Sequence, residues 1–439
     1  MSISLFGFFW IIILSLTCIL KDKYLLYVLL LSFVFQSAWV VLVFGIDLNA
    51  SLITSVFFIA KGVICKRGKI LFPTWAVYGL TFVFLTIAIS IISPNLFSGM
   101  HLNTVTNSGF NFHRLETVVV SFSFSNLTLG FSLLLYLLDA VIVYNLDFKV
   151  SIRDIERVYT NIFIFVILVG LLHVLLMFII GNASFLRIIF HNEYMLYGRT
   201  YFDNFYIDEL RFSRLMSTFD EPSYCGAYLA TSFFYFYYSN LKYRKFYVTL
   251  SLIGLLLNMS STGIVTISIY TLLLLICHMS RKGISKEFII ILFIVIIFII
   301  LLVVNEEFRI TLYNITFGKV NSGSYKLRNL VNNYSLEAFY KSYGLGMGGN
   351  SITSYSLIYS LLSQVGILGL ISYSLLIKSL LCQLKKDIFY EKNIKIQYLI
   401  MLPLISSLLS CQALNFCVMW MGICLYILYL SIYKKERNV

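Results

Sequence analysis

The sequence predicts an all-α, polytopic integral membrane protein with about 12–14 transmembrane helices in a single membrane domain, residues 1–439. Composition is the first observation behind this prediction. Of all residues, 59% are hydrophobic and 12% are charged, whereas soluble domains have about 25% charged residues. The second observation is that apolar runs long enough to cross a bilayer recur along the whole chain. The third is that basic residues gather in the short segments between these runs, the pattern that sets orientation in a membrane.

The charge and the cysteines exclude several other classes. The net charge of +13 does not indicate nucleic-acid binding, because the excess Lys and Arg lie between apolar runs. The 8 cysteines form no CxxC or Cys/His cluster, so the sequence predicts neither a disulfide framework nor a zinc site. The first apolar run, 3–20, has no basic segment before it and no small-residue cleavage site. We therefore expect it to be a span and not a signal peptide.

Taken in order, the apolar runs define about thirteen candidate spans. They cover residues 3–20, 24–45, 52–64, 70–92, 118–144, 158–180, 222–240, 246–258, 262–279, 288–304, 351–381, 396–413 and 416–433. The loops after the odd-numbered spans carry clusters of Lys and Arg, so the positive-inside rule places them in the cytoplasm. The run 246–279 has basic residues at both ends, which predicts that it crosses outward and returns, with a turn at 258–263.

Two large loops, 181–221 and 305–350, then face the outside, and both carry basic residues. The ones of interest are, in chain order, Arg187, Arg211, Arg214, Lys326 and Arg328. Loops of this length translocate with some Lys and Arg, which pair with nearby Asp and Glu, so any one of these side chains can be a structural partner of a nearby acid. As a set placed beside helix starts, they favour a functional role.

Three helices are expected to begin at this outer face. The expected starts and the residues beside them are Glu221 and Pro222, Ser261 and Thr262, and Asn350 after the glycines Gly346 and Gly348. Proline fits the first helical position, and hydroxyl, amide and acidic residues are the preferred caps.

Such helix starts can bind anions. A helix N-terminus presents unpaired N–H groups and about half a positive charge, and it binds phosphate. Glycines let the backbone approach a ligand closely. If the three starts converge with Arg214, Lys326 and Arg328, the chain builds an anion site at the outer membrane–water boundary. Ordinary helix termination is the alternative, because spacing alone does not establish convergence.

Several short motifs resemble those of the O-antigen polymerase and ligase superfamily. In order they are Arg214-x6-Glu221-Pro222-Ser223, the turn 260–263 (SSTG), Ser324-Tyr-Lys-Leu-Arg328, 343–348 (YGLGMG) and 361–369 (LLSQVGILG). Each motif is short. Their order, the two large outer loops and about a dozen spans match together over roughly residues 160–430.

The resemblance implies a GT-C-like membrane fold and an inverting, metal-independent glycosyltransferase without a cofactor. Its donor and acceptor would be polyprenyl-pyrophosphate-linked oligosaccharides at the outer face of a bacterial plasma (inner) membrane. In a polymerase of this kind the growing glycan leaves its lipid pyrophosphate and joins the non-reducing end of a new lipid-linked repeat unit. The product would be O-antigen, capsule or another exopolysaccharide. Partners would be these substrates and the lipid bilayer, with a chain-length regulator protein left open and no nucleic acid.

The resemblance also assigns roles to residues. The family arginines of the two loops map onto Arg214 and Arg328, which would hold the pyrophosphate. From the chemistry that the reaction needs, and not from the resemblance, Glu221 is the candidate to orient or deprotonate the acceptor hydroxyl; a helix cap with an ion pair to Arg214 is its alternative role. The polymerase pattern R-x10-G fits Arg187 with Gly198 but has no match after Arg328. The substrate-binding candidates are Arg187, Arg211, Lys326, Tyr325, Ser261, Thr262, Gly346, Gly348 and Asn350.

Two other functions stay open at this point. A ligase of the same superfamily would carry a histidine just after the glycine turn, and this chain has no His after His278. A lipid-linked oligosaccharide flippase or transporter would show charged residues lining a path inside the spans. The spans of this sequence hold little charge, Asp139 being one case. A secondary transporter would also show halves related by a repeat, and no repeat is found.

Overall fold

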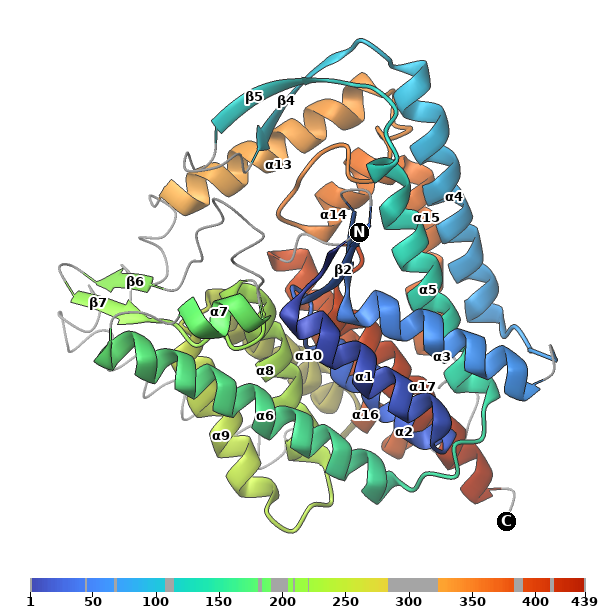
Figure 1. Ribbon diagram of the computed structural model, residues 1–439, viewed down its shortest axis with the longest axis vertical. Helices are drawn as coiled ribbons and strands as arrows, with labels where there is room; N and C mark the ends of the chain where they lie inside the picture. Colours follow the sequence, from blue (N-terminus) through green and yellow to red (C-terminus); the bar gives the residue numbers. More distant parts are fainter. Residues whose placement is uncertain are drawn as a thin grey trace.

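The computed structural model describes residues 2–43, 46–66, 69–106, 114–180, 184–190, 204–207, 210–219, 221–282, 323–382, 390–410 and 414–437. The described chain is mostly helical (Figure 1). Its first helices are α1 (Leu5–Ile19), α2 (Asp22–Ser32), α3 (Ala50–Lys66), α4 (Thr74–Leu96), α5 (Ser125–Asn145), α6 (Ile152–Ile179), α7 (Ser184–Phe190), α8 (Pro222–Tyr238), α9 (Arg244–Asn258) and α10 (Ser261–Lys282). The later ones are α13 (Gly323–Lys341), α14 (Leu357–Ser360), the π-helical turn η2 (Leu361–Val365), α15 (Gly366–Cys382), α16 (Tyr390–Leu409) and α17 (Cys417–Arg437).

Short strands accompany the helices and form three small antiparallel sheets, which the all-α expectation did not include. The strands are β1 (Ser2–Ile3), β2 (Trp39–Val43), β3 (Ile46–Asn49), β4 (His101–Thr106), β5 (Arg114–Val119), β6 (Asn204–Ile207) and β7 (Leu210–Ser213). The sheets have the orders β1-β2-β3, β4-β5 and β6-β7. In the second sheet His101 pairs with Val119, and in the third Asn204 pairs with Ser213.

Five helices among the described residues are long and apolar enough to cross a membrane. They are α4, α5, α6, the continuous segment from α14 through η2 to α15, and α17. They indicate a multi-pass membrane protein. Other predicted spans correspond to shorter apolar helices such as α1, α10 and α16, and the predicted span 288–304 lies outside the described residues.

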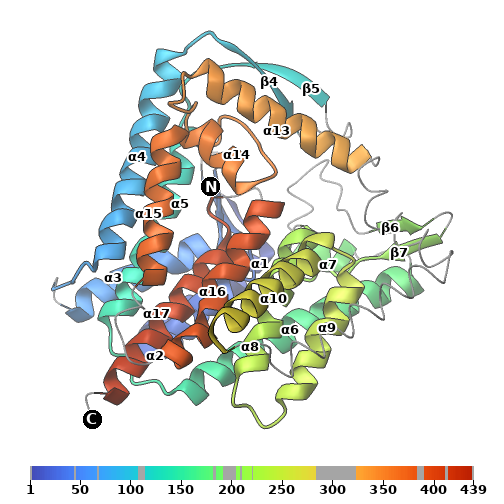
Figure 2. The ribbon, with the colours of Figure 1, turned by 180° about the vertical axis from the view of Figure 1, so that it is seen from behind.

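Helix α8 lies at the centre of one group of helices. This helix is buried along nearly its whole length and contacts α9, α10, α16 and α17. Small residues such as Gly226, Ala227 and Ala230 line it, and small side chains let helices approach closely inside a membrane. Helix α4 packs against both α5 and α15 beside this group (Figures 1 and 2).

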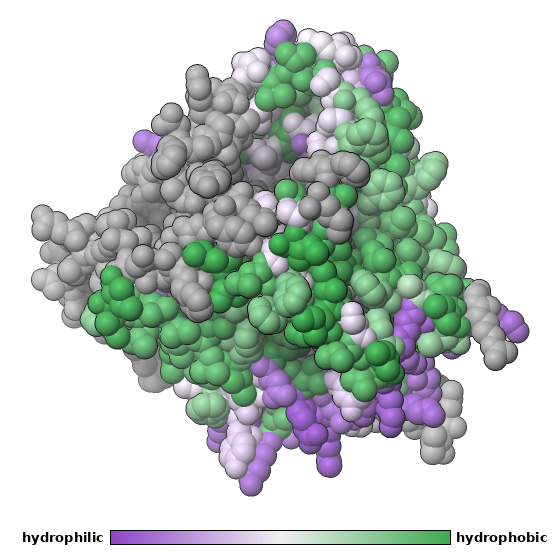
Figure 3. Space-filling view, viewed as in Figure 1, coloured by the Kyte–Doolittle hydropathy of each residue, from purple (hydrophilic) through white to green (hydrophobic). Residues whose placement is uncertain are grey.

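The two ends of the molecule differ in character. Hydrophilic side chains gather along the lower edge in Figure 3, and two ion pairs tie segments together there. Lys435 of α17 lies 2.5 Å from Asp147, and Lys61 lies 3.3 Å from Asp22. These segments belong to those that the positive-inside rule places in the cytoplasm. Helix α13 and the β4–β5 hairpin lie across the opposite end (Figure 1).

The predicted span 24–45 is wrong as a single helix. Helix α2 ends at Ser32, and the chain continues through a turn into β2. The hydroxyl of Ser4 donates a hydrogen bond to the carbonyl oxygen of Trp39, which fixes the sheet to the start of α1. Residues 39–43 are aromatic and β-branched apart from one leucine, a composition that favours a strand. An apolar run alone cannot distinguish a buried strand from a helix.

Candidate functional site

The segment that follows Arg214 is fixed in the bundle. Leu215 is fully buried, and the side-chain amide of Asn258 donates to its carbonyl oxygen at 2.6 Å. The hydroxyl of Ser217 donates to the carbonyl oxygen of Val166 in α6 at 2.6 Å. Arg214 therefore stands on a backbone that is anchored to both α6 and α9, although this part of the chain was predicted only as a loop.

Helix α8 begins at Pro222 as predicted, with Glu221 at the N-cap position. The Glu221 side chain makes no capping hydrogen bond. Its Oε2 instead accepts a hydrogen bond from the hydroxyl of Ser223 at 3.1 Å. The carboxylate therefore does not serve as the side-chain cap of α8. Asp220, the other member of the acidic pair, lies outside the described residues.

The predicted turn at 258–263 is present between α9, which ends at Asn258, and α10, which begins at Ser261. It packs directly on the first turns of α8. A Cβ atom added to Gly226 would lie 3.0 Å from Asn258 Oδ1, and one added to Gly263 would lie 2.9 Å from the Gly226 carbonyl oxygen. The absence of side chains at these two glycines lets the starts of α8 and α10 lie side by side.

The C-terminal turn of α16 joins the start of α10 to the start of α14. The hydroxyls of Thr262 and Ser410 share a hydrogen bond. Ser356, the N-cap residue of α14, donates from its hydroxyl to the carbonyl oxygen of Leu408 at 2.8 Å. The starts of α10 and α14 thus both bond to the end of α16. The Thr262 hydroxyl, one of the expected substrate contacts, is used in this packing.

The third helix start lies at Leu357 and not at Asn350, where the sequence predicted it. Asn350 has a φ of 55°, a left-handed conformation that asparagine tolerates better than most residues. Its side-chain N–H groups donate to Thr128 Oγ1 at 2.8 Å and to the Ser125 carbonyl oxygen at 3.2 Å. Asn350 therefore ties the loop to the start of α5, and this contact holds the chain out of a helical path.

The glycine-rich turn before α14 uses its N–H groups inside the protein. All N–H groups from Gly346 to Asn350 donate to protein oxygens. The acceptors are, in order, Ser342 Oγ, Ser363 O, Gln364 O, Ser90 Oγ and Gln364 Oε1. Gly346 and Gly348 have φ angles of 85° and 94°. These N–H groups hold the turn against η2 and α4, and the predicted substrate contacts of Gly346 and Gly348 stay predictions.

Helix α13 brings Arg328 to the segment that precedes α14. Asn332 Oδ1 accepts a hydrogen bond from the backbone N–H of Tyr355 at 3.0 Å, and the hydroxyl of Ser335 donates to the Thr353 carbonyl oxygen at 3.1 Å. These two bonds hold the segment against α13. The guanidinium carbon of Arg328 lies 5.4 Å from the centre of the Tyr355 ring, within the range of a cation–π interaction.

Arg214, Arg328, Glu221 and Tyr355 form one electrostatic cluster, which we call the arginine cluster. Burial, and in second place the positive charge of Arg328, lower the pKa of the Arg214 guanidinium to about 10. Burial and the negative charge of Glu221 raise the pKa of the Tyr355 hydroxyl, while Arg328 lowers it. Side chains from the first outer loop, α13, the start of α8 and the segment before α14 therefore lie close together.

The other expected contacts fall in different places. Lys326 is exposed and lies two residues from Arg328, which is about 200° around a helix, so it points away from Arg328. Tyr325 is 46% exposed, and Ser261 is exposed at the first residue of α10. Thus Lys326 does not join Arg328 as a second positive charge on the same helix face.

Two further candidates can be placed only by their backbone. Arg187 lies in α7, and Arg211 lies in β7, where it pairs with Tyr206. The side chains of both arginines, and Gly198 of the R-x10-G pattern, lie outside what the structure describes. Their predicted contacts with substrate stay predictions.

Tyr355 is the member of the arginine cluster that sequence reasoning missed. It follows Ser354 in a polar stretch without helical or strand periodicity, so no pattern singled it out. Its position between the glycine-rich turn and the next helix start was the available signal. The hydroxyls of Ser354 and Ser360 share a hydrogen bond that fixes the backbone on its other side.

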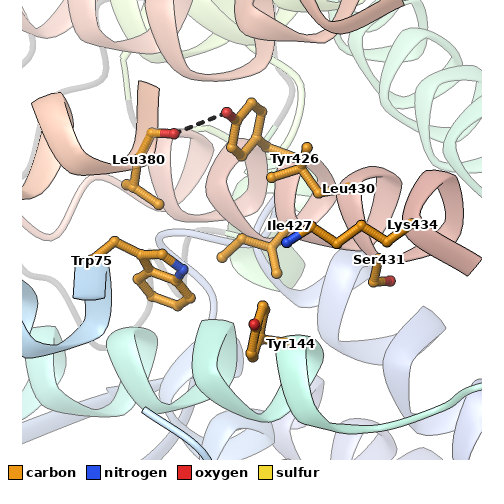
Figure 4. A pocket seen from close by; sticks show the side chains of 8 residues that line it. All are labelled: Trp75, Tyr144, Leu380, Tyr426, Ile427, Leu430, Ser431 and Lys434. Carbon is orange, nitrogen blue, oxygen red and sulfur yellow. Dashed lines mark hydrogen bonds between the residues drawn. The ribbon is translucent and has the colours of Figure 1, made fainter. Parts of the chain in front are cut away.

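The small cavity in Figure 4 lies apart from this cluster, between the ends of α4, α5, α15 and α17. Its volume is about 10 Å³, room for no more than about one water molecule. The Tyr426 hydroxyl donates to the Leu380 carbonyl oxygen at 2.9 Å beside it. It is too small for a ligand.

Comparison with known proteins adds no family to this description. No protein-family model matches the chain, and no curated protein matches it significantly. The functional argument therefore depends on the geometry of the arginine cluster and on the motifs of the sequence.

Proposed function

We propose that the chain is a membrane glycosyltransferase of the O-antigen polymerase type, with about 12–14 spans in a GT-C-like arrangement. It joins polyprenyl-pyrophosphate-linked oligosaccharide repeat units into a surface polysaccharide at the outer face of a bacterial inner membrane. The observation that carries the proposal is the meeting of Arg214 and Arg328, which come from two different outer loops, with the charge of Arg328 helping to lower the pKa of Arg214. Two guanidinium groups held near one another are stabilised by an anion between them.

The reaction needs a pyrophosphate held in place and an acceptor hydroxyl on the opposite face of the sugar. Arg214 and Arg328 bind the pyrophosphate and stabilise the charge that grows as the sugar C–O bond breaks. Preset charges of this kind are usually the largest single contribution to catalysis. Arginine suits this role because its planar group grips phosphate oxygens in pairs.

Glu221 then acts on the acceptor hydroxyl as orienting group or general base. Its carboxylate is held by the Ser223 hydroxyl at 3.1 Å and lies near enough to Tyr355 to raise the pKa of that phenol. The guanidinium of Arg328 lies over the face of the Tyr355 ring, which helps to hold it in place. The acid and the two arginines thus come from neighbouring structural elements. A direct glycosyl transfer between two bound substrates requires the groups that act on each substrate to be held close together in this way.

The polymerase is favoured over the two alternatives by specific features. The ligase alternative lacks its expected histidine, because the chain has no His after His278. The flippase alternative calls for a charged path inside the spans. Asp139 is fully buried and accepts a hydrogen bond from Ser55 at 2.5 Å, so this intramembrane acid takes part in helix packing.

The test is the size distribution of surface polysaccharide in a deletion strain that is complemented with variants. Wild type restores a ladder of chain lengths, whereas Arg328→Ala and Arg214→Ala leave single repeat units on the surface. Arg328→Lys keeps the charge but loses the fork, so it restores only short ladders. Arg244→Ala is the matched control, because Arg244 is exposed at the opposite end of the molecule, and it restores the full ladder.

Other outcomes identify the alternatives. Long lipid-linked polymer that never reaches its final anchor identifies a ligase. Repeat units trapped at the cytoplasmic face identify a flippase, and then the arginine cluster has another role. Glu221→Gln with unchanged chain length contradicts the base role of Glu221 while leaving the polymerase assignment intact.

A further inference from the structure

A cavity of about 330 Å³ lies at the far end of α8 from the arginine cluster. Helices α6, α8, α16 and α17 surround it. Its walls include one acid and several tyrosines, namely Glu156, Tyr235, Tyr238, Tyr398, Tyr429 and Tyr433. The cavity adjoins the hydrophilic end where Lys435 pairs with Asp147, the end that the positive-inside rule places in the cytoplasm. Its size falls in the range of small-molecule sites.

The tyrosines form a connected aromatic wall. The rings of Tyr238 and Tyr398 stack with their centres 5.7 Å apart. The hydroxyls of Tyr235 and Tyr429 are hydrogen-bonded to each other at 2.8 Å, and the ring centres of Tyr429 and Tyr433 lie 6.3 Å apart. Faces of tyrosine rings carry negative potential and attract cations, and aromatic walls of this kind recognise organic ammonium groups.

Glu156 adds a buried negative charge to this wall. It is only 5% exposed. Its Oε1 accepts a hydrogen bond from the backbone N–H of Asn240 at 3.1 Å, and within the described residues no Lys or Arg forms an ion pair with it. Arg153, an exposed residue three positions earlier on α6, acts on it through charge alone. A buried carboxylate without a paired cation is costly, so a cation that enters the cavity is favoured.

We propose that this cavity binds an organic ammonium group, with Glu156 as the counter-ion and the faces of Tyr238 and Tyr398 as the aromatic wall. The same chemistry is present in the amine headgroup of a phospholipid and in a free small amine. The carboxylate and the ring faces disfavour phosphate and other anions. The proposal does not depend on the glycosyltransferase assignment, because it concerns a separate cavity at the opposite end of the molecule.

The first arm of the test asks whether the ammonium group belongs to a lipid. The full chain is reconstituted in nanodiscs of equal phosphatidylethanolamine and phosphatidylglycerol, and the lipids retained on it are counted by native mass spectrometry. If the site takes a lipid amine, wild type retains phosphatidylethanolamine in excess. Glu156→Gln removes that excess, since glutamine still accepts the Asn240 N–H but carries no charge. Glu337→Gln, an exposed acid on α13, leaves it unchanged.

The second arm asks whether a free amine binds. The midpoint of thermal unfolding is measured in nanodiscs of phosphatidylglycerol alone during titration with ethanolamine or tetramethylammonium. Binding raises the midpoint of wild type, and Glu156→Gln weakens the apparent affinity by about tenfold or more, as expected for loss of a charge-assisted contact.

A pair of variants at Tyr238 tests the aromatic wall. Tyr238→Phe keeps the ring face and the binding, while Tyr238→Leu removes the ring and weakens binding several-fold. The proposal is refuted if neither lipid retention nor the midpoint shift differs between wild type and Glu156→Gln. It is also refuted if inorganic phosphate or a neutral sugar raises the midpoint as much as the amines do.

Discussion

Replacing Gly346 with alanine should destabilise the fold, and the structure sets the size of the effect. Gly346 has a φ of 85°, and a Cβ atom there would lie 2.6 Å from Gly366 N and 2.8 Å from the Gln364 carbonyl oxygen. Both neighbours are backbone atoms, so neither can rotate away. The left-handed conformation costs an alanine about 1–2 kcal/mol, and overpacking adds about 1–3 kcal/mol. We expect a loss of about 2–5 kcal/mol.

Gly344→Ala is the matched control for this prediction. Gly344 has nearly the same φ, 82°, but its nearest neighbours are ring atoms of Phe339 at 3.6 Å, an ordinary contact. Gly344→Ala should therefore lose only the part of the stability that comes from the left-handed conformation, about 1–2 kcal/mol. Thermal unfolding in detergent should rank wild type first, Gly344→Ala second and Gly346→Ala clearly last. If Gly346→Ala unfolds like Gly344→Ala but abolishes polymer formation, the turn contacts substrate and our structural interpretation of it is refuted.

Three further predictions concern the arginine cluster and the loop beside it. Arg328→Ala should slow polymerisation by about a hundredfold or more with little change in unfolding temperature. The rate is measured as polymer formed from lipid-linked repeat units by purified protein. A large drop in the unfolding temperature alongside the loss of rate would indicate that Arg328 is structural. Because the pKa of Arg214 is lowered to about 10, its charge is complete below that pH and lost above it. Affinity for inorganic pyrophosphate, followed by calorimetry, should therefore not fall near neutral pH but should fall as the pH rises through about 10, and a fall already near pH 7 would contradict this. Asn350→Ala loses bonds to Thr128 and Ser125 and should lower stability by about 1–3 kcal/mol, whereas an unchanged unfolding midpoint would show that the loop is held by other contacts.

Local signals in the sequence predicted much of what surrounds the arginine cluster. Proline at the first helical position placed the start of α8 at Pro222, and a serine cap signal placed α10 at Ser261. These signals act within one or two turns of chain, so they can be read without a structure. The turn between α9 and α10 could also be predicted from the sequence, because basic residues at both ends of 246–279 required the chain to cross outward and return.

Features that depend on contacts between residues far apart in the chain could not be predicted from the sequence. The start of α14 at Leu357 is set by Asn350 bonding to α5, a partner more than two hundred residues away. The neighbourhood of Arg214 and Arg328 depends on how α13 docks on the segment before α14, through Asn332 and Tyr355. Span 24–45 failed for a different reason, because a run of apolar residues carries no period that separates strand from helix.

The bonding of the starts of α10 and α14 to the end of α16 has an electrostatic consequence. The last turn of α16 carries the partial negative charge of its free carbonyl groups, while the first turns of α10 and α14 carry partial positive charge. The bonds of Thr262 to Ser410 and of Ser356 to Leu408 hold these opposite poles side by side, so their partial charges largely cancel at this end of the bundle. The field that an incoming anion meets is then supplied mainly by the two guanidinium groups. A family of such proteins could vary its helix ends freely, but the charge at positions 214 and 328 would have no substitute in the backbone.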